Sequence, residues 1–142
     1  MRIDEERFQQ IARDAVPGAV VRLGFPFWLR LFVLPGVLAI TLGNRIYVAR
    51  LAIGRGEAEI LGLLRHEWAH VEQMRRLGLI RFLDRYAREY LLLRRSGLSG
   101  WAAYAAISFE VEARAAEDAA SLSGACADHY NETAEQEESS VS

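Results

Sequence analysis

The chain alternates between segments with helical spacing of apolar residues and short apolar runs bounded by Gly or Pro. The first pattern predicts amphipathic helices and the second predicts buried strands. We expect helices over about Asp4–Asp14, Glu57–Leu77, Ile80–Arg95 and Trp101–Leu122, the last with a break near Ser108. We expect strands over about Val20–Leu23, Phe27–Val33, Val37–Leu42 and Arg45–Ala49. Gly43-Asn44 between the last two runs is a tight-hairpin signal. The pattern predicts an α+β fold, in which a small antiparallel sheet precedes the helix over 57–77 and two further helices.

Length and composition limit the classes of protein that this sequence can encode. A chain of 142 residues is expected to form one domain, over residues 1–124. Residues 125–142 form an acidic, Ser-rich tail that we expect to be disordered. The net charge of −2 gives no sign of a nucleic-acid partner. The single Cys126 excludes an intrachain disulfide and a Cys-based zinc site. The start, MRIDEERFQQ, lacks the features of a secretory signal, so we expect a cytoplasmic protein.

The most apolar segment runs from Phe25 to Gly43. Arg30, two prolines and Gly36 interrupt it, and its longest uncharged piece is shorter than the roughly 20 residues that a spanning helix needs. We therefore interpret the segment as buried strands and expect no membrane insertion. A patch that contacts a membrane surface stays open as the less favoured alternative.

The string His66-Glu67-Trp68-Ala69-His70 lies inside the expected helix over 57–77. Residues four apart lie on one face of a helix, so the two imidazoles can bind the same metal ion. Glu67 projects beside that pair, where a carboxylate can act as a general base. The alternative is an ordinary helix that carries two His and a solvated Glu. An apolar surround makes this alternative weaker, because a buried His pair needs polar partners.

A catalytic zinc site needs a third protein ligand. The only other His, His129, falls in the expected tail, so we look for a carboxylate on the last helix. Four acids occur there, at Glu110, Glu112, Glu117 and Asp118. Glu110 and Glu112 are two residues apart, so only one of them can face the site. The alternative is that all four form an exposed charged face.

The segments ITLGNRIYV, LLRHEWAHVEQMRRLG and SFEVEARAAE together resemble the gluzincin branch of the zincin metallopeptidases. They are most similar to small minimal gluzincins and to peptidase-like domains of the DUF4157 type. The resemblance covers about Val37 to Asp118. It implies a zincin-like domain that binds Zn²⁺ through His66, His70 and Glu110. It also implies that Glu67 is the general base.

One position departs from the pattern of this family. The family's Glu is followed four residues later by an Asp that orients a ligating His, and that place falls on Arg114. The orienting role then passes to Glu112, Glu117 or Asp118, or stays unfilled.

The function that we expect is zinc-dependent hydrolysis of peptide bonds in a peptide or protein substrate. Candidate donors to the developing oxyanion are Tyr86, Tyr90 and Tyr104, and the run Arg45–Ala49 is a candidate edge strand for binding an extended peptide.

The first alternative is a catalytically silent metal-binding or structural module of the same fold. The second is a di-iron helical protein, since Glu67 and His70 also form a Glu-x-x-His. The chain lacks the second such motif that this class requires. The oligomeric state is not predicted.

Overall fold

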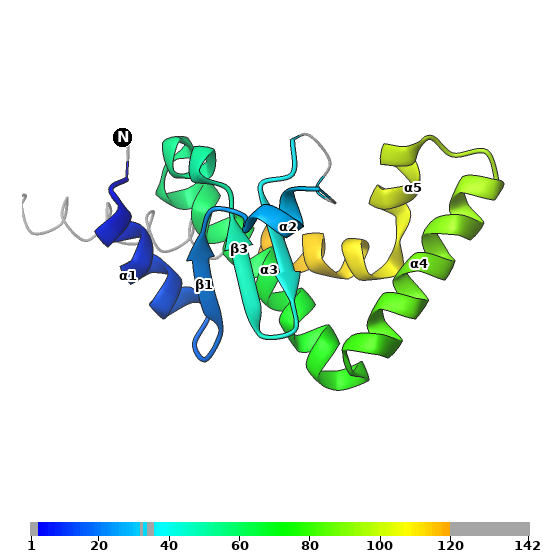
Figure 1. The fold of residues 1–142 in the computed structure, drawn as a ribbon, viewed down its shortest axis with the longest axis horizontal. Helices are drawn as coiled ribbons and strands as arrows, with labels where there is room; N and C mark the ends of the chain where they lie inside the picture. Colours follow the sequence, from blue (N-terminus) through cyan, green and yellow to red (C-terminus); the bar gives the residue numbers. More distant parts are fainter. Residues whose placement is uncertain (1–2, 32, 34–35, 120–142) are drawn as a thin grey trace, which may run out of the picture.

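The computed structural model describes residues 3–31, 33 and 36–119. It shows an α+β fold in which a three-stranded sheet lies in front of a long helix, with further helices to either side (Figure 1). The helices and strands follow one another in the order α1 (Glu5–Ala15), β1 (Val20–Leu23), α2 (Phe27–Arg30), β2 (Ala39–Leu42), β3 (Arg45–Val48), the 3₁₀ helix η1 (Arg50–Arg55), α3 (Glu57–Leu77), α4 (Leu79–Arg95) and α5 (Gly100–Ala106). A last helical stretch, residues 108–119, reaches the end of the described part.

The sheet is mixed, so the prediction of an antiparallel sheet is only half right. β2 and β3 form the expected antiparallel hairpin around Gly43, whose φ of 62° suits a residue without a side chain. β1 instead runs parallel to β3, because the chain crosses through α2 before it enters β2. The strand order is β1-β3-β2, so Arg45–Val48 is the central strand. The prediction of an edge strand at Arg45–Ala49 is therefore wrong, and β2 is an edge.

The strand predicted over Phe27–Val33 is also wrong, because its first four residues form the short helix α2. Pro26 precedes this helix, and its carbonyl accepts hydrogen bonds from the backbone N–H groups of Leu29 and Arg30. Leu29 alone is buried, whereas Phe27, Trp28 and Leu31 are exposed. Because α2 is only one helical turn long and Leu29 faces the protein, its neighbouring apolar side chains face solvent.

The inner face of the sheet packs on α3 and forms the larger part of the core. Ile46 and Val48 of β3 are completely buried, as are Leu64 and Val71 of α3. A second cluster joins the end of α3 to α4 and to the 108–119 helix through Met74, Phe82, Ile107 and Phe109. This second cluster places the 108–119 helix beside α3.

Two sharp bends set the course of the last helices. Gly78, with φ of 83°, separates α3 from α4. Ile107 is non-helical and separates α5 from the 108–119 helix, which confirms the predicted break near Ser108. Glu89 of α4 accepts hydrogen bonds of 2.8 Å from the backbone N–H and the hydroxyl of Ser108, and so holds the start of that helix. Among the described residues, no helix is long and apolar enough to cross a bilayer.

Candidate metal centre

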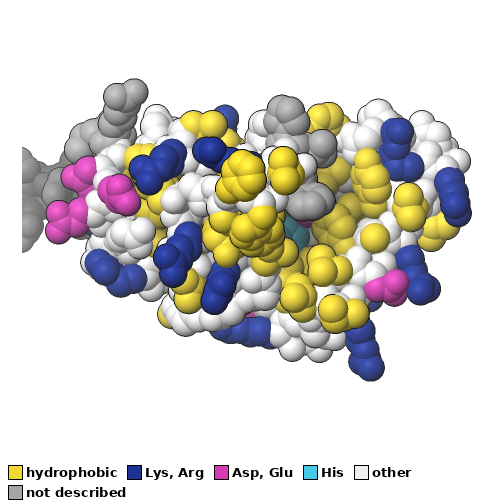
Figure 2. Space-filling model, viewed as in Figure 1, with side chains coloured by type: hydrophobic (Ala, Val, Ile, Leu, Met, Phe, Trp, Pro, Cys, Tyr) yellow, Lys and Arg dark blue, Asp and Glu magenta, His cyan; other side chains and the backbone are white. Residues whose placement is uncertain are grey.

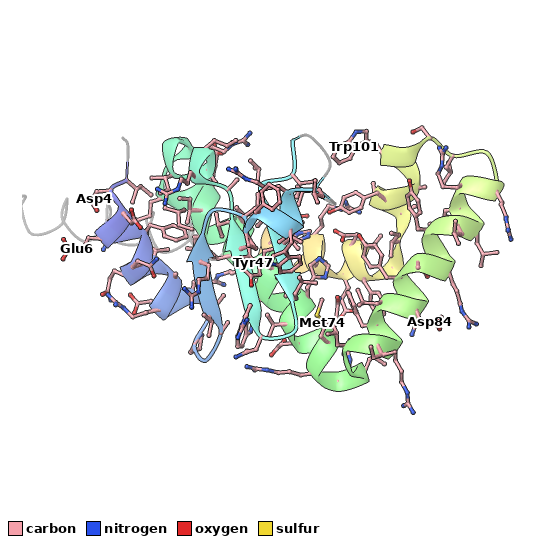
Figure 3. The ribbon with its side chains drawn as sticks, viewed as in Figure 1. Asp4, Glu6, Tyr47, Met74, Asp84 and Trp101 are labelled. Carbon is pink, nitrogen blue, oxygen red and sulfur yellow. The ribbon has the colours of Figure 1, made fainter. Side chains whose placement is uncertain are left out.

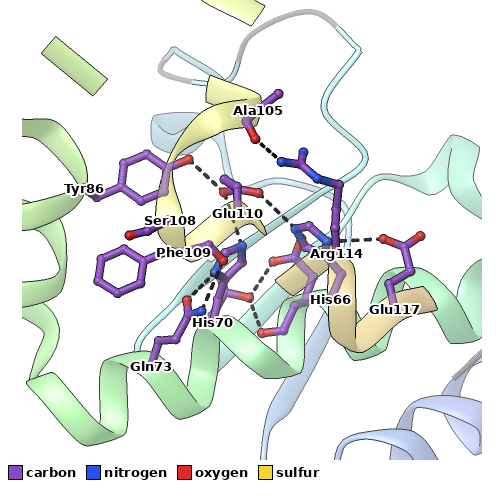
Figure 4. A network of polar contacts seen from close by, with 12 residues as sticks. His66, His70, Gln73, Tyr86, Ala105, Ser108, Phe109, Glu110, Arg114 and Glu117 are labelled. Carbon is purple, nitrogen blue, oxygen red and sulfur yellow. Dashed lines mark hydrogen bonds and ion pairs between the residues drawn. The ribbon is translucent and has the colours of Figure 1, made fainter. Parts of the chain in front are cut away.

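His66 and His70 lie one turn apart on α3, as their spacing predicts. Their ring centroids are 5.0 Å apart. Both side chains point toward the 108–119 helix (Figure 4). This helix runs antiparallel to α3 here, because His66 contacts Glu117 whereas Gln73 contacts Phe109. The His66 side chain is 12% exposed and that of His70 is 8% exposed, so the pair is largely shielded from solvent.

Glu110 on the 108–119 helix approaches both imidazoles. Its Oε2 lies 3.1 Å from Nε2 of His66, and its Oε1 lies 3.3 Å from Nε2 of His70. Candidate ligand atoms of the three residues all lie within 4.8 Å of one another. The structure thus brings together a buried group, His66, His70 and Glu110, that could hold a metal ion.

Gln73 determines how the His70 ring is oriented. The side-chain nitrogen of Gln73 donates a hydrogen bond of 3.2 Å to the carbonyl of Phe109, which can only accept. Its Oε1 therefore faces Nδ1 of His70 at 2.9 Å, and Nδ1 must carry the proton. In the neutral ring this leaves the lone pair of Nε2 directed at Glu110, which is the arrangement that a metal ligand requires. Gln73 is itself buried.

Glu117 contacts the outer nitrogen of His66. Its Oε2 lies 3.3 Å from Nδ1, so both ring nitrogens of His66 face carboxylate oxygens. Of the three acids that the sequence offered as orienting partners of a ligating His, Glu117 is the one that contacts a candidate ligand. Arg114 instead donates a hydrogen bond to the carbonyl of Ala105 (Figure 4).

The two other acids of this helix lie outside the site. Glu112 is exposed and pairs with Arg76 at 3.2 Å, and Asp118 is exposed. Because Glu110 and Glu112 point to different sides of the helix, only Glu110 reaches the histidines, as their spacing predicts. His129 and Cys126 lie outside the described residues.

The charges of the centre stabilise one another. Burial opposes ionisation of Glu110, but hydrogen bonds from His66 and His70 outweigh it and hold the pKa of this carboxyl below its usual range. Burial disfavours a charged His70, but the hydrogen bond and charge of Glu110 raise its pKa above the ordinary value. The ionised form of Glu110 and the protonated form of His70 therefore stabilise each other.

Two of the three candidate tyrosines lie next to Glu110. The hydroxyl of Tyr86 donates a hydrogen bond of 2.9 Å to its Oε1. Burial and the charge of Glu110 raise the pKa of both Tyr86 and Tyr104, so each keeps its proton. Tyr90 packs against the second apolar cluster, as do Tyr86 and Tyr104.

Glu67 is buried beside the His pair and is held by the edge strand. The hydroxyl of Thr41 on β2 donates a hydrogen bond of 2.6 Å to Oε2 of Glu67. Within the described residues, no group hydrogen-bonds to its other oxygen. Burial raises the pKa of Glu67, while His70 and Thr41 act in the opposite direction. A raised pKa brings a carboxylate closer to the range in which a general base can accept and release a proton.

The donor set fits a divalent transition metal. Two imidazole nitrogens and one carboxylate are the ligands that zinc uses in many catalytic sites with three protein ligands. Among the described residues, no side-chain polar atom that is completely shielded from solvent lacks a hydrogen-bond partner. The fit to a metal therefore rests on the types of the three side chains and on their convergence. Protons that now lie between imidazole and carboxylate would be replaced by the ion.

Sequence reasoning found the three converging residues and the candidate base, but missed Gln73 and Thr41. The four-residue spacing is local, whereas these two contacts depend on how other elements pack on α3. Comparison with protein-family models, with curated proteins and with solved structures finds no match to this chain.

Proposed function

We propose that this chain is a minimal zincin-like metallopeptidase that hydrolyses peptide bonds with one zinc ion. The observation that carries the proposal is the convergence of His66, His70 and Glu110 beside the buried carboxylate of Glu67. In zinc peptidases, two His on one helix and a more distant Glu bind the ion, and the Glu between the His is the base. Residues of these types occur at all four places here.

In this proposal, metal binding, proton transfer and stabilisation of the oxyanion are carried out by different residues. His66, His70 and Glu110 would hold zinc, which supplies an electrophile that activates water and polarises the scissile carbonyl. Glu67 would take a proton from the attacking water and deliver it to the leaving amine. Its raised pKa and its oxygen without a hydrogen-bond partner in the described residues support that role. Tyr86 and Tyr104 are the two candidate donors to the developing oxyanion.

The edge strand β2 supports a peptide as the substrate. Thr41 fixes this strand to Glu67, so its free edge runs beside the candidate base. An extended peptide can add to such an edge through main-chain hydrogen bonds. The geometry would place a peptide bond of the substrate near Glu67 and the metal-binding group.

The test is cleavage of an unbiased peptide library by the zinc-loaded full chain and by a zinc-loaded Glu67→Gln variant. We expect cleavage by the wild type only, because the variant keeps the shape of the side chain and loses the base. Metal content and thermal unfolding of both proteins check that the variant is intact. Equal cleavage by both would point to a contaminant. Absence of cleavage by the wild type would support the silent metal-binding module, which the substitution of Arg114 for the family's Asp favours.

A further inference from the structure

The short helix α2 exposes an unusual set of large apolar side chains. Phe27 is 81% exposed, Leu31 is 73% exposed and Trp28 is 52% exposed. Trp101, at the start of α5, is 60% exposed, and its side chain extends from α5 toward the middle of the molecule in the view of Figure 3. Soluble proteins usually expose large apolar side chains singly. A cluster of them marks a surface that contacts another protein, a ligand or a membrane.

Three arginines around α2 have no acidic partner among the described residues, whereas Arg55 further along the chain pairs with Glu59. From Ala15 to Gly56 the sequence holds five Arg and no Asp or Glu, which gives this segment a formal charge of +5. Arg22, Arg30 and Arg45 are all exposed, and none forms an ion pair with another described residue. The register of β1 and β3 puts Arg22 and Arg45 on the outer face of the sheet, with Tyr47 between them.

Figure 2 shows that arginine and hydrophobic side chains share the face of the molecule that is also viewed in Figure 1. Arginines and hydrophobic side chains cover its centre, and the acidic side chains gather toward its two ends. A histidine side chain is visible at the bottom of a hollow in this face, between hydrophobic side chains. Only His66 and His70 are described, so the hollow opens onto the candidate metal centre.

We propose that this face docks on an anionic membrane surface. The contact would be made by the α2 surface, defined as Phe27, Trp28, Leu31 and Trp101 with Arg22, Arg30 and Arg45. Aromatic and aliphatic side chains enter the boundary between headgroups and acyl chains, while Arg side chains pair with anionic headgroups. The hollow above the metal centre would then open toward the bilayer.

The charge distribution favours lipid over a second copy of the chain. A symmetric dimer would bring the same arginines against one another, with no acid between residues 15 and 56 to offset them. An anionic bilayer supplies the missing negative charge and the apolar phase together. Peripheral docking also requires no spanning helix.

The experiment is co-sedimentation of the full chain with phosphatidylcholine vesicles, with and without phosphatidylserine. We expect binding that depends on phosphatidylserine and that falls about tenfold or more in the double variant Phe27→Ser/Leu31→Ser. The matched control is Ile80→Ser/Leu92→Ser, which removes two exposed apolar side chains of α4 outside the α2 surface. This control should bind like the wild type. Thermal unfolding shows whether each variant is folded.

Two results would overturn the proposal. Binding that is absent in the wild type, or equal in the wild type and the α2 variant, would exclude apolar insertion and leave an acidic protein as the occupant. A dimer in solution that the α2 variant abolishes would assign the surface to a second copy. The assay measures binding, so its outcome is separate from whether the protein cleaves peptides.

Discussion

Oε1 of Gln73 lies 2.9 Å from Nδ1 of His70, and this contact directs the other ring nitrogen toward Glu110. The amide cannot be reversed, because its nitrogen already donates to the carbonyl of Phe109. One buried amide therefore joins α3 to the 108–119 helix and sets the orientation of a candidate ligand.

The first prediction concerns this amide. Gln73→Leu should weaken zinc binding by about 10–100-fold, because the His70 ring loses the group that orients it. It should also lower the free energy of unfolding by about 1–3 kcal/mol, because two buried polar groups lose their partner. Competition with a chelator measures the first effect and denaturant unfolding measures the second. Unchanged zinc affinity in a folded variant would mean that Gln73 has no part in the site.

The second prediction separates two acids of the same helix. Glu117→Ala should weaken zinc binding by about tenfold, because it removes the carboxylate beside Nδ1 of His66. The matched control is Glu112→Ala, which removes an exposed partner of Arg76 and should leave zinc affinity unchanged. Chelator competition on both variants makes the comparison. Equal effects of the two substitutions would show that the loss comes from general charge alone.

These two contacts also mark where prediction from the sequence ends. The long helix α3 was predicted with its observed bounds, because it combines apolar spacing with glycines at both ends. The choice of Glu110 over Glu112 depended on helical periodicity and on the family resemblance, and the structure places Glu110 against both histidines. Gln73 and Glu117 could not be given their partners, because those contacts depend on the antiparallel approach of two helices.

The errors in the sheet have a similar origin. The run that begins at Phe27 has the composition of a strand, yet its first four residues form the helix α2, in which Leu29 is the only buried side chain. The sequence pattern does not indicate that the other apolar residues of this run are exposed, and only the structure shows it. The parallel pairing of β1 with β3 is a long-range choice that no local pattern in the sequence specifies.

The third prediction concerns pH. The pKa of His70 is raised in the metal-free protein, so its protonation stabilises the fold below its unfolded value of about 6.5, and this stabilisation is lost as pH rises through the higher folded value. The pKa of Glu110 is lowered, so its contribution is present above the unfolded value and is lost only as pH falls through the lower folded value. Zinc must displace the proton of His70.

The increase in Tm that zinc causes should therefore be larger at about pH 8 than at about pH 6. Thermal unfolding with and without zinc at both pH values measures it. His70→Ala serves as the control and should show little zinc-dependent stabilisation at either pH. A zinc-dependent increase that is larger at the lower pH would contradict the proposed competition between zinc and protons.

The most direct test of the metal centre is the number of zinc ions bound per chain after zinc loading and removal of excess metal. We predict one zinc in the wild type, and its loss in His66→Ala, His70→Ala and Glu110→Ala, with Glu112→Ala as the control that retains it. X-ray absorption of the same wild-type sample should show nitrogen and oxygen ligands at about 2.0–2.2 Å. No bound zinc in the wild type, or two metal ions in each chain, would contradict the proposal that His66, His70 and Glu110 hold a single ion.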